Sequence, residues 1–286
     1  MRPLNPRSLF ALATLGCWLE CERLVADEAT DDRPAKGIQD NSFLVEEAYN
    51  QEPGVVQHIF NFHHEIKKQA GPDDRASQVV FSQEWPLWSQ SHQFSYTVPF
   101  SWLDNGGQRA DGVGDILLNY RFQALYEDET KPAFAPRVSL VLPTGNALKG
   151  LGDDTLGYQA NLPVSKIVHD RLTLHANAGL TFLPGLNGRN PVYYNLGGSV
   201  IYAPTRNFNL MLETVGLWGE SVNEGGGIDR EFSAVISPGV RYAFNFVNNS
   251  QLVLGLAVPI GLTRSSPDYG MFLYVSFEHF FQKQNK

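Results

Sequence analysis

The chain has 286 residues and a formal charge of −8, from 22 Lys and Arg against 30 Asp and Glu. This acidic balance excludes a general nucleic-acid binder, because such a protein needs a basic face to neutralise phosphates. Aromatic residues make up 12% of the chain and charged residues 18%, with 26 glycines, which favours strands and turns over helices.

Residues 1–26 have the features of a secretory signal peptide. Two arginines precede a short apolar core at 9–15, and Ala26 is a candidate cleavage point. Both cysteines, Cys17 and Cys21, lie in this segment, so a chain cleaved at Ala26 has no disulfide and no thiolate chemistry. Lipidation of Cys17 and metal binding by the cysteine pair are the alternatives, and removal with the signal peptide is favoured over both.

Residues 27–54 precede the regular part of the chain. Residues 27–42 are polar and acidic and predict a disordered periplasmic lead-in. Residues 43–54 combine apolar residues with glutamates, and two interpretations stay open for them: a plug or gate in the periplasmic mouth of a barrel, or a simple periplasmic tail.

The body of the chain contains no sequence suited to a membrane-spanning helix. Its longest uncharged run, residues 242–263, is interrupted by three asparagines and a proline, whereas a spanning helix needs about 20 apolar residues. Only helices and closed barrels satisfy the backbone in lipid. An exported chain of this kind is therefore either soluble or a membrane β-barrel.

Apolar and polar residues alternate from residue 55 onward. In 251–261, for example, every second residue from Leu252 to Ile260 is a large aliphatic residue. A period of two over ten residues predicts long strands with one apolar face, and these lengths suit strands that cross a membrane at a tilt. The predicted strands are 55–67, 77–89, 92–102, 113–126, 134–143, 155–167, 171–182, 192–203, 207–218, 230–243, 250–262 and 269–281.

The predicted connections alternate in length. Those after odd-numbered strands, such as 103–112 and 144–154, are mostly long, whereas several after even-numbered strands, such as 90–91, are very short. Long loops outside and short turns in the periplasm are typical of an outer-membrane barrel. We therefore predict an all-β, up-and-down antiparallel barrel of about 12 strands over residues 55–281, with 282–286 as a tail. A secreted soluble β-sandwich is the alternative fold.

Three segments resemble one family of outer-membrane proteins. They are FLVEEAYNQEPGVVQH at 43–58, GVGDILLNYR at 112–121 and RVSLVLPTG at 137–145, and the family is that of the "MetA pathway of phenol degradation". The resemblance covers residues 43–281. It implies a β-barrel that moves small hydrophobic or aromatic molecules, and no functional residue of the family carries over to this chain.

Sparse charges and one histidine occupy the polar faces of the predicted strands. In a barrel they would line the lumen, either as a selectivity lining for a largely neutral path or as pairs that brace the interior. Three positive and three negative charges nearly cancel, which disfavours a porin dedicated to acidic oligosaccharides. The candidate lumen residues are Glu84, Arg121, Arg137, His175, Glu213, Arg241 and Glu278.

The sequence therefore predicts a passive outer-membrane channel of a Gram-negative cell. Its expected partners are outer-membrane lipid, a small-molecule solute and the barrel-assembly machinery, which reads a C-terminal strand ending in aromatics such as 269–281. We expect no cofactor, no metal and no enzymatic activity. The alternatives are a structural or adhesive barrel with a filled lumen and a barrel lipid hydrolase, in which His175 would act with a serine and a carboxylate.

Overall fold

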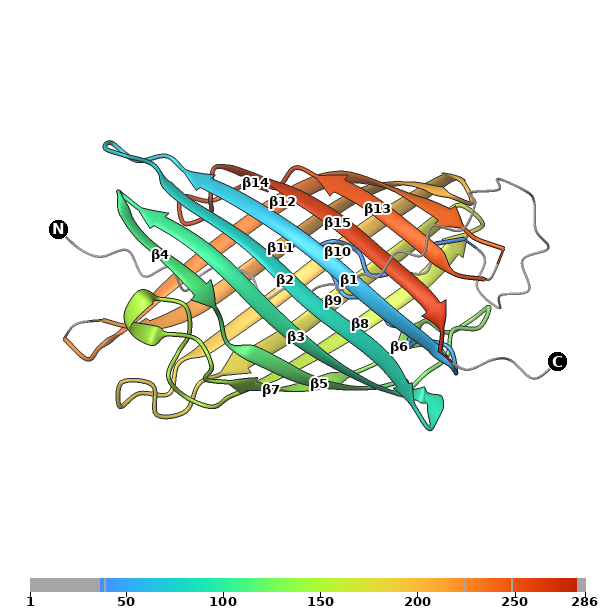
Figure 1. Cartoon of the computed structure of the whole chain (residues 1–286), viewed down its shortest axis with the longest axis horizontal. Coiled ribbons are helices and arrows are strands. Elements are labelled where there is room, and N and C mark those ends of the chain that lie inside the picture. The colour runs from blue at the N-terminus through green and yellow to red at the C-terminus, as the bar shows by residue number, and fades with distance from the viewer. Residues whose placement is uncertain (1–36, 39, 224, 248, 282–286) are drawn as a thin grey trace.

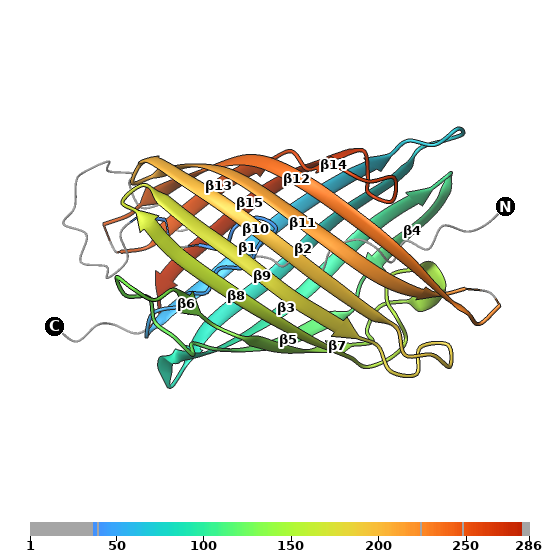
Figure 2. The ribbon, with the colours of Figure 1, turned by 180° about the vertical axis from the view of Figure 1, so that it is seen from behind.

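Strands with one apolar and one polar face close on themselves to form a barrel (Figures 1 and 2). In this computed structural model the described residues are 37–38, 40–223, 225–247 and 249–281, so the predicted signal peptide and tail lie outside them. The elements are β1 (Val55–Lys67), β2 (Asp74–Leu87), β3 (Ser89–Asn105), β4 (Gln108–Val113), β5 (Ile116–Phe122), β6 (Ala133–Phe134), β7 (Arg137–Leu142), the 3-10 helix η2 (Ala147–Lys149), β8 (Gly157–His169), β9 (Leu172–Phe182), β10 (Val192–Thr205), β11 (Phe208–Val222), β12 (Ile228–Asn245), β13 (Gln251–Ala257), β14 (Ile260–Gly261) and β15 (Tyr269–Phe280).

Hydrogen bonding between the first and last strands closes the sheet. β1 pairs with β2 on one side and with β15 on the other, in a register that sets Val55 opposite Phe280. Three wall strands are interrupted and appear as the pairs β4/β5, β6/β7 and β13/β14. Pro259 lies in the last of these breaks and cannot donate a ladder hydrogen bond. The described part of the chain is thus a closed 12-stranded antiparallel barrel, which confirms the predicted fold.

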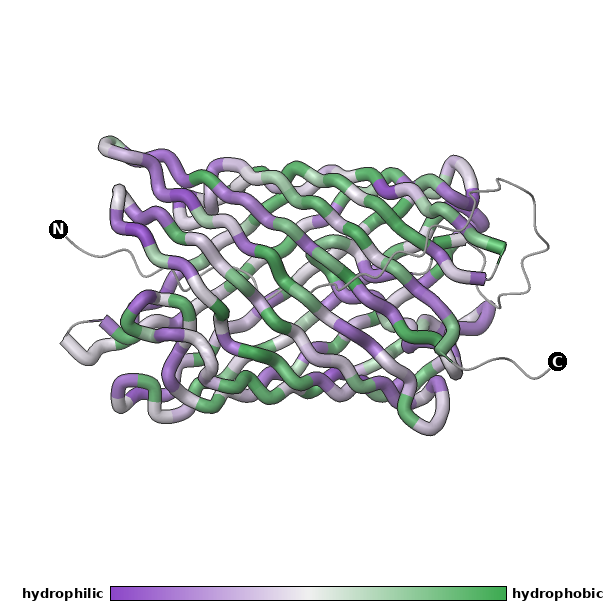
Figure 3. Tube along the Cα trace, in the orientation of Figure 1, coloured by the Kyte–Doolittle hydropathy of each residue, from purple (hydrophilic) through white to green (hydrophobic). Residues whose placement is uncertain are grey.

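The two faces of each strand meet different surroundings. Along β1, Gln57, Ile59 and Asn61 point inward and are buried, whereas Phe60 and Phe62 point outward. Figure 3 shows apolar residues distributed over the wall and polar residues gathered toward its ends. Large apolar side chains that are exposed on the outer face include Leu140, Leu162, Leu196, Val200, Leu212, Leu254 and Leu256. Such an outer band is stable against lipid and costly against water.

Two predicted connections differ from the observed ones. Residues 103–112 do not form a long loop, because β3 and β4 continue as a hairpin around Gly106 and Gly107. Both glycines have positive φ angles, of 60° and 96°, and positive φ at both central residues defines the tight turns that suit hairpins. The turn predicted at 90–91 lies instead at Trp88, where φ is 57°.

The barrel has two unlike ends. We call one end the loop end, where strands are joined by residues 68–73, 106–107, 143–156, 183–191, 223–227 and 262–268. We call the other the turn end, where strands are joined by Trp88 and by residues 123–132, 170–171, 206–207 and 246–250. No helix among the described residues is long and apolar enough to cross a bilayer.

Replacing Leu212 with Arg should destabilise the barrel in lipid. The Leu212 side chain is exposed on the outer face of β11, and a cation in the middle of a barrel's apolar band costs about 2–4 kcal/mol. The measurement is urea unfolding in lipid vesicles, read from the mobility of unboiled samples on a gel. Leu148→Arg, in exposed η2, is the control. Equal midpoints for the two variants would contradict burial of this band in lipid.

Candidate functional site

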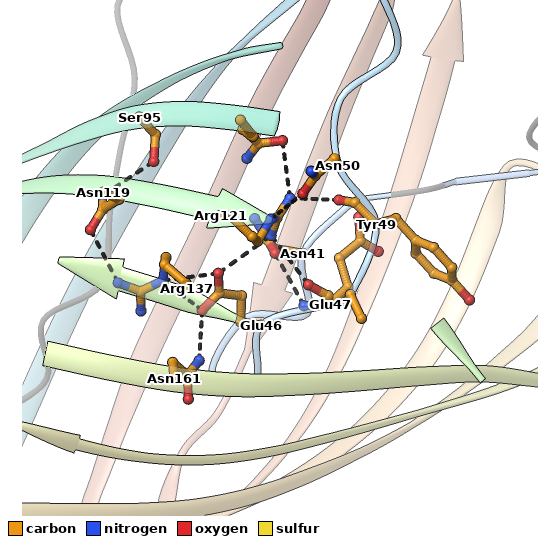
Figure 4. Close-up of polar contacts among 12 residues, drawn as sticks. Asn41, Glu46, Glu47, Tyr49, Asn50, Ser95, Asn119, Arg121, Arg137 and Asn161 are labelled. Carbon is orange, nitrogen blue, oxygen red and sulfur yellow. Dashed lines mark hydrogen bonds and ion pairs between the residues drawn. The ribbon is translucent and has the colours of Figure 1, made fainter. Parts of the chain in front are cut away.

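The N-terminal part of the described chain lies inside the barrel. We call residues 37–54 the inner segment, of which residue 39 is not described. Its residues contact side chains from β1, β5, β7, β8, β9, β11, β12 and β15, on all sides of the lumen. Figure 4 shows part of this contact, with Glu46, Glu47, Tyr49 and Asn50 among inward side chains of the wall.

The described residues of the inner segment form no strand or helix, so their backbone polar groups need other partners. Glu213 supplies three acceptor contacts: its carboxylate receives the N–H groups of Phe43, Leu44 and Val45 at 3.2, 2.9 and 3.1 Å. On the neighbouring strand β12, Arg241 does the reverse, donating to carbonyl oxygens of residues 38, 40 and 41 at 2.7–3.4 Å. A buried carboxylate and a buried guanidinium thus serve as backbone partners.

Arg121 repeats this role nearer the turn end. It donates to the carbonyl oxygens of Glu47 and Tyr49 at 3.2 and 2.5 Å and to Asn50 Oδ1 at 2.8 Å. Gln123 donates to the carbonyl of Ala48 at 2.7 Å and accepts from the backbone N–H of Asn50 at 3.0 Å. Further wall partners of the segment's backbone are Gln93, Ser165 and Asn177.

The wall also fits the apolar side chains of the segment. The ring of Phe43 is buried and lies 5.4 Å, centroid to centroid, from the rings of Phe272 and Tyr274. Gly239 and Gly255 form the adjoining wall, where an added Cβ would come within 2.8 and 2.5 Å of ring carbons of Phe43. These two glycines leave the space that the ring occupies.

Glu46 forms the closest ion pair between the segment and the wall. Arg137 Nε lies 3.0 and 2.9 Å from the two carboxylate oxygens, Arg121 lies 3.3 Å from one of them, and Asn161 donates to the other at 2.6 Å. Burial raises the pKa of Glu46, but the charges of Arg137 and Arg121 outweigh burial and hold this pKa below its usual range. Glu46 is therefore a carboxylate at neutral pH.

The structure places the seven candidate lumen residues in separate groups. Arg121, Arg137 and Glu84 lie together around Glu46, with 4.0 Å between Arg121 and Glu84. Glu213 and Arg241 hold the segment on the β11–β12 side. The other two lie apart: His175 contacts Ser165, and Glu278 lies toward the turn end beside Glu47.

Sequence reasoning missed the neutral members of the site. Asn161, Asn177, Gln93, Gln123 and Ser165 all bind the inner segment. Each lies two or four positions from another buried polar residue, and residues at such spacing share one face of a strand. The alternation that identified the charged residues therefore also places these five on the inward face. Their role depends on the position of the inner segment, which the pattern does not give.

A cavity of about 370 Å³ occupies the lumen between the inner segment and the loop end. Its floor includes Leu44, Glu46 and Arg137, and loop residues Gly150–Asp153 contribute to its wall. A second cavity of about 80 Å³ lies beside the segment and is also lined by Glu46 and Arg137. The ion pair between these two residues therefore lies where the cavities meet.

No arrangement suited to metal binding is found in the described part of the chain. It contains no group of three His, Cys, Asp or Glu residues placed to hold a metal. His58 and His279 meet with 3.2 Å between Nε2 atoms, but as a pair only. Ser165 Oγ lies 2.7 Å from His175 Nδ1, yet it is fully buried and receives the N–H of Ala48. A substrate has no access to this serine in the observed arrangement.

A closed barrel with an apolar outer band and a polar lumen defines an outer-membrane β-barrel protein. Residues 55–278 match the family described as "Putative MetA-pathway of phenol degradation", and the chain belongs to that family. Its fold is similar to that of an outer membrane channel from Pseudomonas putida F1, with 14% identity, a TM-score of 0.63, and coverage of 81% of this chain and 97% of that one.

Two further barrels are less similar. The translocator domain of the autotransporter NalP from Neisseria meningitidis is 11% identical with a TM-score of 0.48, covering 81% of this chain and 90% of its own. The NanC porin is 8% identical with a TM-score of 0.47, covering 78% and 100%. No curated protein matches the chain in sequence.

Replacing Gly255 with Val should expel Phe43 from its niche. Exposing a buried Phe costs about 1.5–3 kcal/mol, which corresponds to a rise of roughly 10- to 100-fold in the open population. The readout is maleimide labelling of Ser42→Cys, a buried position, in a chain whose two native cysteines are replaced by Ser. Gly71→Val, at a glycine with open space around it, is the control. Unchanged labelling in Gly255→Val would show that the niche does not hold the segment.

The packing of the inner segment should weaken as pH rises. Burial, followed by the nearby charge of Asp40, raises the pKa of Glu47 from 4.5 to about 8, although Arg241 and Arg121 oppose this and Glu84 adds to it. The packed state of the inner segment favours the protonated form of Glu47. The stability of that packed state therefore falls as pH rises from 4.5 to about 8 and levels off above this range. We expect Ser42→Cys labelling, relative to an exposed cysteine in loop 68–73, to rise over this interval. Glu47→Gln should lessen the rise, part of which comes from Asp40, because burial also raises the pKa of that carboxyl group. An equally steep profile in that variant would contradict the assignment.

Proposed function

We propose that this protein is a passive channel for small, apolar or aromatic molecules across the outer membrane. The supporting observation is the cavity of about 370 Å³ that extends from the loop end down to the inner segment. Its volume is in the range of small-molecule sites. In this proposal the loop end faces the cell exterior, as long connections do in bacterial barrels.

The inner segment acts as a plug in this proposal. The larger cavity ends on the segment, where Glu46 and Leu44 form its floor, and the smaller cavity lies beside the segment. Without the segment, this space would continue along the lumen. Polar side chains hold the plug by hydrogen bonds and ion pairs, which can exchange with water one at a time. Solutes would pass when the plug shifts or leaves, moving down their concentration gradient.

The candidate residues divide between plug and path. Arg121, Glu213 and Arg241 would hold the plug, because their polar atoms are engaged with its backbone. Arg137 would face the solute, because it borders both cavities. Glu84, His175 and Glu278 would line the lumen below the plug. Membrane insertion would use the barrel-assembly machinery, with β15 as the recognised C-terminal strand.

One observation favours a second function. The inner segment fills the lumen on the turn-end side with side chains that are almost fully buried, such as Phe43, Val45 and Ala48. A filled lumen is the expected feature of a structural or adhesive barrel, in which the segment would be a permanent core. The two functions differ in whether the segment can be released.

Replacing Glu213 with Ala should open the channel. The variant removes the acceptor of three buried N–H groups, and each unpaired donor costs about 1–3 kcal/mol. Conductance in planar bilayers and swelling of vesicles in benzyl alcohol should both rise severalfold over the unmodified protein. Glu129→Ala, at an exposed position in the 123–132 turn, should leave both unchanged.

The opposite result would select the structural function. If Glu213→Ala folds, as shown by its mobility shift on boiling, and labelling of Ser42→Cys shows a released segment, but no solute passes, the channel proposal is wrong. If the segment stays protected in this variant, then Glu213 does not hold it, and cleavage of the segment would be the next test of the plug.

A further inference from the structure

The guanidinium of Arg137 lies at the closed end of the larger cavity. Besides Glu46, it contacts Asn119 Oδ1 at 3.1 Å, Gln159 Oε1 at 2.9 Å and Ser139 Oγ, all through Nη1. Among the residues that the structure describes, nothing accepts a hydrogen bond from its Nη2. The side chain is 17% exposed, and Figure 4 shows it between Asn119 and Glu46. It is therefore fixed in orientation, with one nitrogen left for another acceptor.

The cavity above Arg137 is apolar over much of its wall. Side chains of Val80, Leu117, Val141, Leu183, Val215 and Leu217 line it among polar residues, so the guanidinium closes one end of a space that can hold an apolar group. Small-molecule sites combine such a wall with few polar groups that fix the ligand's orientation. This arrangement suits a ligand with an apolar body and a single anionic head.

Arg137 and Glu46 form a pair that a solute can imitate. A guanidinium binds a carboxylate through a planar fork of N–H donors, and any carboxylate that reaches the floor offers the same oxygens as Glu46. Asn161, which donates to Glu46 at 2.6 Å, also lines the larger cavity. Exchange of one carboxylate for another keeps the charge on Arg137 neutralised, so it costs less than removing Glu46 alone.

The outer part of the cavity limits the charge of the ligand. Glu220, Glu231, Asp115 and Asp153 line it toward the loop end. Asp115 is engaged by the N–H groups of Gly145 and Asp153, at 2.9 and 2.8 Å, and Glu220 pairs with Arg230 at 2.9 Å. These carboxylates do not approach the floor, but they repel a ligand with a second negative charge. The cavity thus favours a monoanion.

We propose that the floor of this cavity binds small apolar molecules carrying one carboxylate, which take the place of Glu46 on Arg137 and so loosen the inner segment. This inference rests on the proposed channel function and adds to it a ligand class and a means of opening. Glu46 acts as a built-in competitor that occupies the site until such a solute arrives. Neutral apolar solutes would enter the cavity but would leave the ion pair intact.

Binding to the purified full-length barrel tests the site directly. The probes are benzoate, its neutral analogue benzyl alcohol and the dianion phthalate, with affinity measured by calorimetry in detergent. We expect benzoate to bind at least tenfold more tightly than either of the others. Arg137→Gln should lose at least tenfold in benzoate affinity, whereas Arg109→Gln, in the exposed β4 hairpin, should bind like the unmodified protein.

Glu46→Gln supplies a result that a purely structural role would not give. Removing the competing charge should strengthen benzoate binding severalfold, opposite in sign to Arg137→Gln. If Arg137→Gln fails to fold, as judged by its mobility on unboiled gels, Arg137→Lys serves instead and should weaken binding through loss of the fork. Equal affinity for benzoate and benzyl alcohol, or unchanged benzoate affinity in Glu46→Gln, would overturn the proposal.

A second measurement separates this proposal from the channel itself. Benzoate added to the Ser42→Cys protein, with Arg137 and Glu46 unchanged, should raise its labelling, and phthalate should not. If benzoate binds with the expected pattern and loosens the segment but no solute crosses a bilayer, the site stands and the channel is wrong. If solutes cross while benzoate neither binds nor changes labelling, the channel stands and the site is wrong.

Discussion

The arrangement inside this barrel depends on the backbone of the inner segment, which has no secondary structure to satisfy it. A buried N–H or C=O group without a partner costs about as much as a lost hydrogen bond. Here the wall supplies those partners through side chains: Glu213 accepts three consecutive N–H groups, and Arg121 and Arg241 donate to carbonyl oxygens. The polar face of the sheet is therefore matched to a particular stretch of peptide.

This matching explains why strong charges occur in the lumen of a barrel with nearly balanced charge. Arg121 and Arg241 are both engaged with backbone oxygens of the inner segment, so they contribute less to the selectivity of an open path than their number suggests. Arg137 differs, because its hydrogen bonds go to side chains, Glu46 among them, and because it borders both cavities. A reversible contact at this position couples the contents of the outer cavity to the position of the segment.

The fold and the site place different demands on the same strands. Outward residues such as Leu196 and Leu212 need only be apolar, since lipid accepts many shapes. Inward residues must be individually correct: Gly239 and Gly255 leave room for one ring, and Asn177 both donates to and accepts from the backbone of Glu46. Substitutions should therefore be tolerated far better on the outer face than on the inner one.

The sequence by itself determined the twelve strands and their faces. Alternation of apolar and polar residues is a local property of each strand, and it does not depend on how the sheet closes. The same alternation predicted which charged residues face the lumen. Strand ends such as 103–105 and the turn at Trp88 were misplaced, since hairpin length depends on pairing across the turn. Only the tertiary structure decided that Glu46 meets Arg137 and that Phe43 fills the niche at Gly239 and Gly255. Those contacts join residues about 90 and 200 positions apart, and no local pattern records such distances.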